Sequence, residues 1–261
     1  MRFTLSSPHA CTAVDDDALA AWHADGALKV TGLAPPEWVE HTRGRVAGIL
    51  GAPPEDPAAW DGLRSQSLKP LGKESACVPV DTAPVKAAID ALLDGEWSRP
   101  KSGGNWFCNP PTHTDLRGLD LLPRRLWHWD DRPDLHPAGG LWAFSPLTEL
   151  PAGSGGTWMV AGSHRHVLEF YDRLPEEKRG KPTKQAKKWF AAEYPYFAAL
   201  NGDAPLELDS DSADGDAVKL VDVSGAPGDV VFMQDFVVHS KPDVIGPGPR
   251  VCHMITVAPA P

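Results

Sequence analysis

The stretch Leu126-Trp127-His128-Trp129-Asp130 alternates apolar and polar side chains with a period of two. This period is typical of a β-strand, in which residues i and i+2 point to the same side. His128 and Asp130 should therefore lie on one face, and Trp127 and Trp129 on the other. A nitrogen ligand and an oxygen ligand would then face the same space, which predicts a metal site. A strand end whose polar side chains simply meet water would give the same pattern.

Two further His-x-Asp pairs occur in the chain, so the motif alone is a weak signal. His23-Ala24-Asp25 lies in a predicted helix, and His113-Thr114-Asp115 follows two prolines. Only the pair at His128 has a strand-like context. With the distant His239 it would form a set of two imidazoles and one carboxylate, which leaves open coordination positions and suits non-haem Fe(II) oxygenases. Arg250 then offers a planar fork of donors that could hold the carboxylate of a keto acid.

The second half of the chain consists of short apolar runs separated by Gly and Pro turns. Strands are predicted at 141–144, 157–160, 230–233 and 251–257, and a Gly-Asp turn precedes the third. Residues 1 to about 100 are predicted to form a mostly helical wrapper, with helices at 17–23 and 36–50 and an early strand at 27–31. The predicted fold is mainly β with flanking helices, around a double-stranded β-helix (jelly-roll, cupin-like) core at 101–261. The length favours a single domain over 1–261.

The order of these motifs resembles the phytanoyl-CoA dioxygenase-like (PhyH) family of Fe(II)/2-oxoglutarate-dependent oxygenases over nearly the whole chain. Besides His128-x-Asp130, the matching pieces are Gly155-Gly156-Thr157 with Gly162-Ser163-His164-Arg165, the strand Gly228-Asp229-Val230-Val231-Phe232, and His239 with Arg250 eleven residues beyond it. The helix, turn, strand and second helix expected at the N-terminus also match the usual opening of the family.

The resemblance implies an oxidoreductase in which His128, Asp130 and His239 bind Fe(II) and form the catalytic centre, while Arg250 pairs with the far carboxylate of 2-oxoglutarate. It also implies that O2 is consumed, that succinate and CO2 are released, and that a small-molecule substrate is hydroxylated. Related halogenases replace the carboxylate ligand with Gly or Ala, so the presence of Asp130 favours oxygenation. Desaturation, epimerisation and ring closure stay open, and no feature identifies a CoA site.

The same resemblance implies further contacts with 2-oxoglutarate. Phe144 matches a position where some relatives place an aromatic ring against the co-substrate, although core packing would explain it equally well. Two residues beyond Arg250, where relatives often have Ser or Thr, this chain has Cys252, a poor hydrogen-bond donor. Thr157 is a candidate replacement. Asn105 lies on a possible strand where relatives often place co-substrate or substrate contacts.

Composition excludes several classes of protein. The net charge of −10 argues against sequence-independent nucleic-acid binding, which needs a cationic surface. No apolar run reaches the length of about 18 residues that a membrane-spanning helix needs, and the acidic Asp15-Asp16-Asp17 argues against a signal peptide. The four cysteines are scattered without a Cys-x-x-Cys motif, which favours reduced thiols in a cytoplasmic protein.

Two other classes of function remain open from the sequence. One is a jelly-roll protein that binds a metal without turnover, as a sensor or structural partner. The other is a metal-dependent cupin-like enzyme that uses no keto acid, and Cys252 gives it slight support. A basic cluster at 178–188 could dock an anionic substrate or partner, or could simply be a solvated helix face. Its members are Lys178, Arg179, Lys181, Lys184, Lys187 and Lys188. The substrate and the oligomeric state are not indicated.

Overall fold

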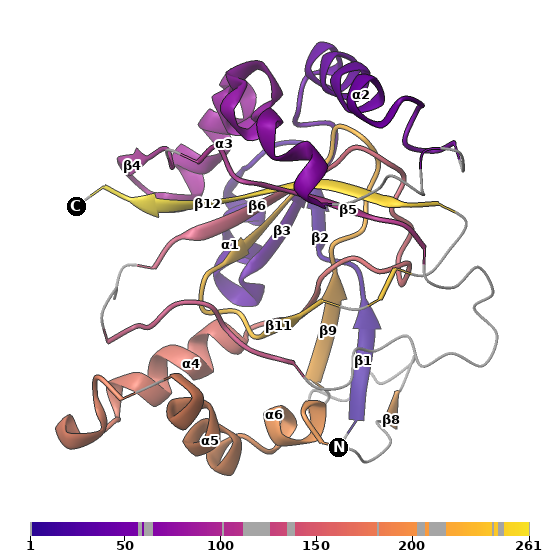
Figure 1. Ribbon diagram of the computed structural model, residues 1–261. Helices are drawn as coiled ribbons and strands as arrows, with labels where there is room; N and C mark the ends of the chain where they lie inside the picture. Colours follow the sequence, from indigo (N-terminus) through magenta and orange to yellow (C-terminus); the bar gives the residue numbers. More distant parts are fainter. Residues whose placement is uncertain are drawn as a thin grey trace.

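The computed structural model contains two β-sheets with helices on their outer sides (Figure 1). It describes residues 2–56, 59, 65–100, 102–111, 126–134, 139–181, 183–202, 207–208, 218–241, 243–244 and 248–260. Side chains from both sheets meet in a common core, which includes Phe144 and Val231 from one sheet and Met159 and Val221 from the other. The predicted jelly-roll class, mainly β with flanking helices, is confirmed.

The larger sheet has seven strands within the described residues, and β10 and β6 lie in its middle. Pairing is antiparallel from β3 through β10 and β6 to β12, whereas β2 runs parallel to β3. In spatial order the strands are β2 (His9–Cys11), β3 (Ala27–Val30), β10 (Val230–Gln234), β6 (Leu141–Pro146), β12 (Arg250–Pro259) and β4 (Trp97–Ser98). The seventh, β5 (Asn105–Asn109), pairs with the first residues of β12.

The smaller sheet contains five strands in the part of the chain that the structure describes. Its spatial order is β11 (His239–Ser240), β7 (Trp158–Val160), β9 (Val218–Asp222), β1 (Arg2–Ser6) and β8 (Glu207–Leu208). β7 is antiparallel to both of its neighbours, and β1 runs parallel to both of its own. The short β11 lies at the edge of this sheet and carries the buried His239.

Helices cover both sheets, and each group buries its apolar side chains against one of them. The helices α1 (Asp16–Asp25), α2 (Pro36–Leu50) and α3 (Ala83–Leu93) pack on the larger sheet, with the 3-10 helices η2 (Ser65–Lys73), η3 (Ser75–Cys77) and η4 (Pro79–Asp81). The helices α4 (Ser163–Asp172), α5 (Thr183–Glu193) and α6 (Pro195–Leu200) pack on the smaller sheet, and η5 (Glu176–Lys178) joins α4 to α5. In Figure 1, α2 and α3 lie at one end of the molecule and α4–α6 at the other.

The first 100 residues contribute more to the sheets than the sequence indicated. The expected helix at 36–50 and the early strand are present as α2 and β3, but β1, β2 and β4 also join the sheets. Phe3 of β1 is fully buried among residues of the smaller sheet and α4–α6. Conversely, the helix α4 begins at Ser163, within the second half of the chain. Helices and sheets are therefore interleaved along the chain and do not divide at residue 100.

Asp229 holds the turn that opens the central strand β10. Its carboxylate accepts hydrogen bonds from the backbone N–H groups of Gly32 and Ala226, each at 3.0 Å, and the side chain is buried. We expect Asp229→Ala to lower the free energy of unfolding by about 2–4 kcal/mol, because hydrogen bonds to a buried charge contribute roughly 1.5–3 kcal/mol each and are not fully additive. Urea denaturation measures this change.

The exposed Glu40 of α2 provides a matched control for the loss of a carboxylate. Glu40→Ala should change the free energy of unfolding by less than about 0.5 kcal/mol. If Asp229→Ala changed the free energy of unfolding as little as this control does, the hydrogen bonds of Asp229 would not stabilise the turn.

Two histidines outside the predicted metal site, His164 and His253, are buried. His253 of β12 donates from Nε2 to the carbonyl of Gly103 at 2.8 Å, and His164 of α4 makes the same kind of contact with the carbonyl of His23 at 3.2 Å. Burial lowers the pKa of each of these two imidazoles to about 4. An unfolded histidine titrates near pH 6.5, so both favour the fold only in the neutral form.

Stability should therefore fall with acidification. The contribution of each histidine is complete above about pH 6.5 and is lost as the pH falls through about 4, with a slope of about 1.4 kcal/mol per pH unit for each proton taken up on unfolding. We expect urea midpoints to decline between pH 6.5 and pH 4, and His253→Gln to make that decline shallower. The same decline in wild type and variant would contradict the role given to His253.

Candidate metal centre

His128 and His239 come together across a single antiparallel bridge. The N–H of His128 donates to the carbonyl of His239 at 2.9 Å, and the reverse bond measures 2.7 Å. The two ring centroids lie 4.5 Å apart. Residues more than one hundred positions apart in the chain are thus held as neighbours by two backbone hydrogen bonds.

Asp130 completes the cluster. Its Oδ1 lies 3.3 Å from Nε2 of His128, and its Oδ2 lies 3.2 Å from Nε2 of His239. Burial works against ionisation of this carboxyl, but without a metal the two imidazoles, when each also carries a proton on Nε2, outweigh it and hold the pKa of Asp130 well below its usual range. One ligand atom from each residue lies within 4.8 Å of the others, and among the described residues this is the one group of at least three such side chains that could hold a metal ion.

Backbone carbonyls orient both imidazoles. Nδ1 of His128 lies 2.6 Å from the carbonyl oxygen of Leu126, and Nδ1 of His239 lies 2.9 Å from that of Val237. A carbonyl oxygen can only accept, so Nδ1 of each ring carries the hydrogen, and Nε2 is the nitrogen left to bind a cation. A second hydrogen bond of this kind typically supports metal-bound histidines, because it fixes the tautomer and the ring orientation.

The alternation expected at residues 126–130 holds, although the segment is not a continuous strand. Trp127 and Trp129 are buried in the core beneath α4–α6, whereas His128 and Asp130 face the cluster. Only His128 makes a β-bridge, and Leu126 has a φ of 63°, outside the extended region. This left-handed turn aims the carbonyl of Leu126 back at the ring of His128.

The other His-x-Asp pairs offer no competing cluster in the described part of the chain. Asp25 forms an ion pair with Lys219 at 2.7 Å, and His23 lies two residues before it on α1, a spacing that separates side chains on a helix. His113 and Asp115 lie outside the described residues.

Arg250 is a buried cation at the first position of β12. Its Nη1 donates to the carbonyl of Gly155 at 2.6 Å and its Nη2 to Oδ1 of Asn109 at 3.1 Å, while the buried Nε has no hydrogen-bond partner. Burial lowers its pKa, yet a guanidinium stays charged in proteins. Among the described residues, no carboxylate lies within ion-pair distance of it.

A small cavity lies beside Arg250, and the structure brings most of the expected co-substrate residues to it. Phe144 of β6 and Thr157, which directly precedes β7, both line it. The remaining lining residues are Phe107, Leu150, Gly156, Val223, Arg250 and Cys252. Burial raises the pKa of the Cys252 thiol to about 12, so this side chain lines the cavity as an uncharged thiol.

Asn105 does not line this cavity. It is exposed at the start of β5, opposite Met254. Asn109, four residues further on the same face of the strand, instead contacts Arg250. Which residue of this face meets Arg250 depends on the register of β5 with β12, which pairs Arg250 with Asn109.

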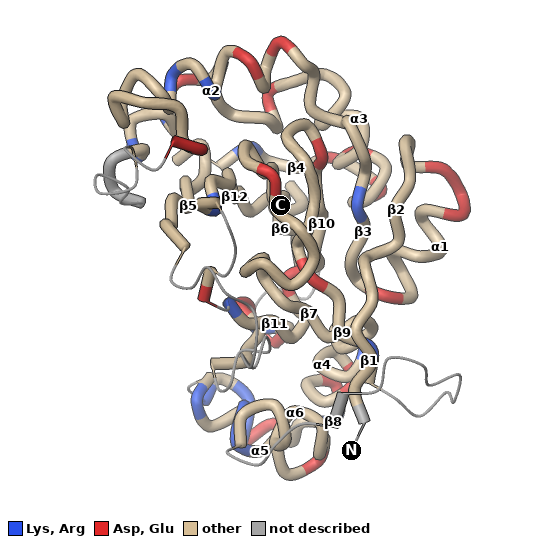
Figure 2. The backbone as a smooth tube through the Cα atoms, turned by 90° about the vertical axis from the view of Figure 1, so that its right-hand side faces the viewer, with Lys and Arg blue, Asp and Glu red and all other residues tan. Residues whose placement is uncertain are grey.

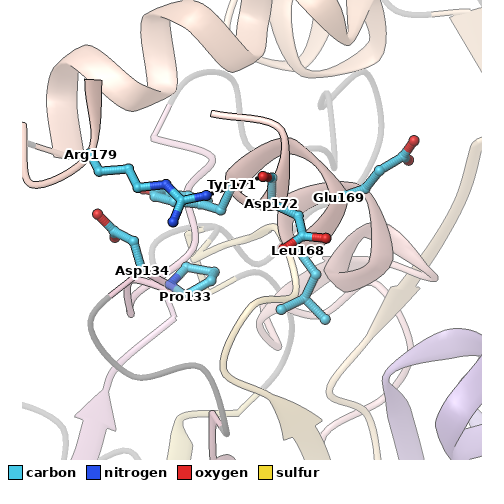
Figure 3. Close-up of a pocket in the computed structure, with 7 residues that line it drawn as sticks. All are labelled: Pro133, Asp134, Leu168, Glu169, Tyr171, Asp172 and Arg179. Carbon is cyan, nitrogen blue, oxygen red and sulfur yellow. Dashed lines mark hydrogen bonds between the residues drawn. The ribbon is translucent and has the colours of Figure 1, made fainter. Parts of the chain in front are cut away.

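A larger hollow, with a volume of about 560 Å³, lies between the loop after Asp130 and the helix α4 (Figure 3). Three of its four charged side chains, those of Asp134, Glu169 and Arg179, already have partners. Asp134 pairs with Arg132 at 2.5 Å, and Arg179 donates to the carbonyls of Leu174 and Asp172. The arrangement of its charges therefore gives this hollow no chemistry comparable with that of the metal cluster.

Two imidazoles, one carboxylate and a buried arginine inside a jelly roll define the class of non-haem iron proteins with a facial triad. The sequence model for Phytanoyl-CoA dioxygenase (PhyH) matches residues 22–252. The chain therefore belongs to the PhyH family, and it is an Fe(II)- and 2-oxoglutarate-dependent oxygenase, an oxidoreductase. No curated protein matches the sequence.

Solved structures support the fold. AviO1 from Streptomyces viridochromogenes Tue57 is 16% identical, with a TM-score of 0.55 over 96% of this chain and 100% of its own. EctD from S. alaskensis with 2-oxoglutarate and 5-hydroxyectoine is 15% identical, with a TM-score of 0.54 over 97% and 77%. EvdO2 from Micromonospora carbonacea var. aurantiaca complexed with 2-oxoglutarate is 15% identical, with a TM-score of 0.52 over 95% and 92%.

Proposed function

We propose that His128, Asp130 and His239 hold Fe(II), that Arg250 holds the far carboxylate of 2-oxoglutarate, and that the enzyme hydroxylates a small-molecule substrate. The convergence of three ligand atoms, with both Nδ1 hydrogens donated to backbone carbonyls, is the observation that carries this proposal. Two nitrogens and one carboxylate oxygen suit Fe(II) and leave positions for exchangeable ligands.

The surroundings of Arg250 suit a dicarboxylate co-substrate. A buried charge without an ionic partner is unfavourable, so an anion in the adjacent cavity would stabilise both itself and the guanidinium. The unpartnered Nε is available as an additional donor. Phe107, Phe144, Leu150 and Thr157 line the same cavity, whose volume of about 10 Å³ would have to widen as such a ligand enters. This environment favours the keto-acid-dependent reading over a cupin enzyme without a keto acid.

The protein's own tasks are positioning and exclusion of water. When bound, iron and 2-oxoglutarate supply the oxidising power, with O2 consumed, succinate and CO2 released, and one oxygen atom inserted into a substrate C–H bond. Carbonyl contacts keep the rings of His128 and His239 in one orientation. Trp127 and Trp129, which flank His128 in sequence, exclude water from the opposite face of this segment, because both are buried in the core beneath α4–α6.

We further propose that the enzyme works in the cytoplasm on a small substrate and binds neither nucleic acid nor membrane. All four cysteines are free thiols, which suits a reducing compartment. None of the helices in the described part of the chain combines the length and the apolar character that crossing a bilayer requires.

Release of succinate from 2-oxoglutarate in air, with Fe(II) supplied, tests this proposal. Wild-type protein should release succinate, and His128→Ala should not. His166→Ala removes an exposed histidine of α4 outside the ligand set and serves as the control. Equal release by wild type and His128→Ala would show that the reaction does not use this centre.

A further inference from the structure

The start of β12, where Arg250 lies, is held by different partners on its two sides. Figure 1 and Figure 2 both show β5 beside β12, and the register between these strands pairs Arg250 with Asn109. On the other side, the pairing of β12 with β6 reaches back only to Cys252, which lies opposite Pro146. The first two residues of β12 therefore extend beyond the end of β6.

One side chain takes the place of a strand partner there. Thr148, two residues beyond the end of β6, donates from its hydroxyl to the carbonyl of Pro249 at 2.8 Å and accepts from the N–H of Val251 at 3.0 Å. A hydroxyl can donate and accept at once, so it satisfies both backbone groups. All three residues are buried, so this hydroxyl is the partner that the two backbone groups need. It bridges the residues immediately before and after Arg250.

The guanidinium group of Arg250 is held by other contacts. Its Nη1 donates to the carbonyl of Gly155, its Nη2 donates to Asn109, and its Cζ lies 5.4 Å from the centroid of the Phe107 ring. These contacts determine where the group points within the cavity. Thr148 is not among the residues that line that cavity, so it acts on the backbone from which the side chain extends.

Holding this backbone matters because strand ends open more easily than strand centres. Without the Thr148 hydroxyl, the start of β12 would keep one hydrogen bond on the side of β6, from the N–H of Leu147 to the carbonyl of Val251 at 2.8 Å. Arg250 would then spend part of its time away from the cavity. A ligand that binds only the held arrangement loses affinity in proportion to the fraction of protein that has it.

We propose that Thr148 is a positioning residue for co-substrate binding: its hydroxyl holds the start of β12 so that Arg250 stays beside the cavity and binds the carboxylate of 2-oxoglutarate. The inference rests on the proposed role of Arg250, and it adds a residue that acts only through this arginine.

The first test replaces the hydroxyl with a methyl group. Thr148→Val should raise the Kd for 2-oxoglutarate about 5- to 100-fold, because the buried N–H of Val251 loses its acceptor. Succinate release at saturating 2-oxoglutarate should stay within about twofold of wild type, since only binding is affected. Thr148→Ser keeps the hydroxyl and should restore most of the affinity. Anaerobic titration calorimetry of the Fe(II) protein measures Kd. A wild-type Kd in Thr148→Val, or no rescue by serine, would overturn the proposal.

Thr82→Val is the matched control. Its hydroxyl also donates to the carbonyl of a proline, Pro79, at 2.7 Å, but it lies at the start of α3 on the outer side of the larger sheet. This variant should lose thermal stability and bind 2-oxoglutarate as wild type does. An equal loss of affinity in Thr82→Val and Thr148→Val would overturn the proposal, because affinity would then follow general stability.

Amide hydrogen exchange of the ligand-free protein, followed by NMR, tests the mechanism without turnover. Thr148→Val should speed exchange of the Val251 N–H at least about fivefold and leave that of Ile255 unchanged, because Ile255 lies where β12 is paired with Ala143 of β6. Unchanged exchange at Val251, or equally faster exchange at both positions, would contradict a local role of the hydroxyl.

A double variant shows whether Thr148 acts through Arg250. In an Arg250→Ala background, Thr148→Val should weaken 2-oxoglutarate binding no further, whereas independent effects would add. A further loss of the single-variant size would overturn the proposal. The failure of the proposed function is distinct: Arg250→Ala alone would then bind 2-oxoglutarate as wild type does. Weak binding by Arg250→Ala together with wild-type binding by Thr148→Val would overturn the role of Thr148 alone.

Discussion

Replacing Asp130 with alanine should abolish decarboxylation of 2-oxoglutarate and lower the affinity for Fe(II) by at least about 100-fold. Changes to residues that merely support a metal ligand already reduce affinity about 10- to 100-fold, so loss of a direct ligand should have at least that effect. Asp130 is also the residue that both imidazoles share, with its oxygens 3.3 and 3.2 Å from their Nε2 atoms. Iron binding is measured by anaerobic equilibrium dialysis, and decarboxylation by release of CO2 from labelled 2-oxoglutarate.

Asp131→Asn is the matched control for Asp130→Ala. The Asp131 carboxylate accepts a hydrogen bond from the N–H of Arg132 at 2.7 Å, and an asparagine side chain can still accept it. This variant should bind iron as wild type does. Full activity in Asp130→Ala would mean that the ligand pair is wrong, and His113 with Asp115 would be the next pair to test.

Replacing Arg250 with alanine should weaken 2-oxoglutarate binding about 100- to 4000-fold and change Fe(II) affinity much less. The guanidinium is buried, and removal of one partner from a buried ion pair typically costs 3–5 kcal/mol. Arg250 does not belong to the metal cluster, so iron should bind without it. Titration calorimetry with each ligand separates the two effects.

Arg250→Ala could also disturb the fold, because it leaves the carbonyl of Gly155 and the amide oxygen of Asn109 without their donor. Arg250→Lys is therefore a second variant that tests the same role. Arg250→Lys keeps the charge but loses the fork, so it should recover part of the affinity for 2-oxoglutarate. Arg99→Ala, which breaks an exposed ion pair with Asp81, should leave both affinities unchanged. Unaltered binding of 2-oxoglutarate in a folded Arg250→Ala protein would remove Arg250 from the site.

The prediction that His128 and Asp130 are metal ligands depended on a local pattern in the sequence. The period of two around His128 determines which side chains share a face, and this stays true even though the segment makes one bridge and no continuous strand. The apolar run after Gly228 and Asp229 likewise forms β10, and the helix expected at 36–50 is α2. Each of these features depends on neighbours within a few residues.

Features that depend on distant partners could not be predicted in this way. Asn109 meets Arg250 across 141 positions of sequence, so choosing it over Asn105 requires the register of β5 with β12. β1 is a strand because it pairs with β9, near the other end of the chain. Lys187 is one member of the basic cluster at 178–188, and only the position of α5 in the fold places its Nζ 5.5 Å from the centroid of the Trp129 ring.

The most direct test of the metal centre is an anaerobic titration of the apo-protein with Fe(II) and then with 2-oxoglutarate, followed by visible absorption. Chelation of iron by the keto acid should produce a saturable metal-to-ligand charge-transfer band, and His239→Ala should lack it. The absence of a band in wild-type protein that has demonstrably bound iron would contradict binding of 2-oxoglutarate at this centre.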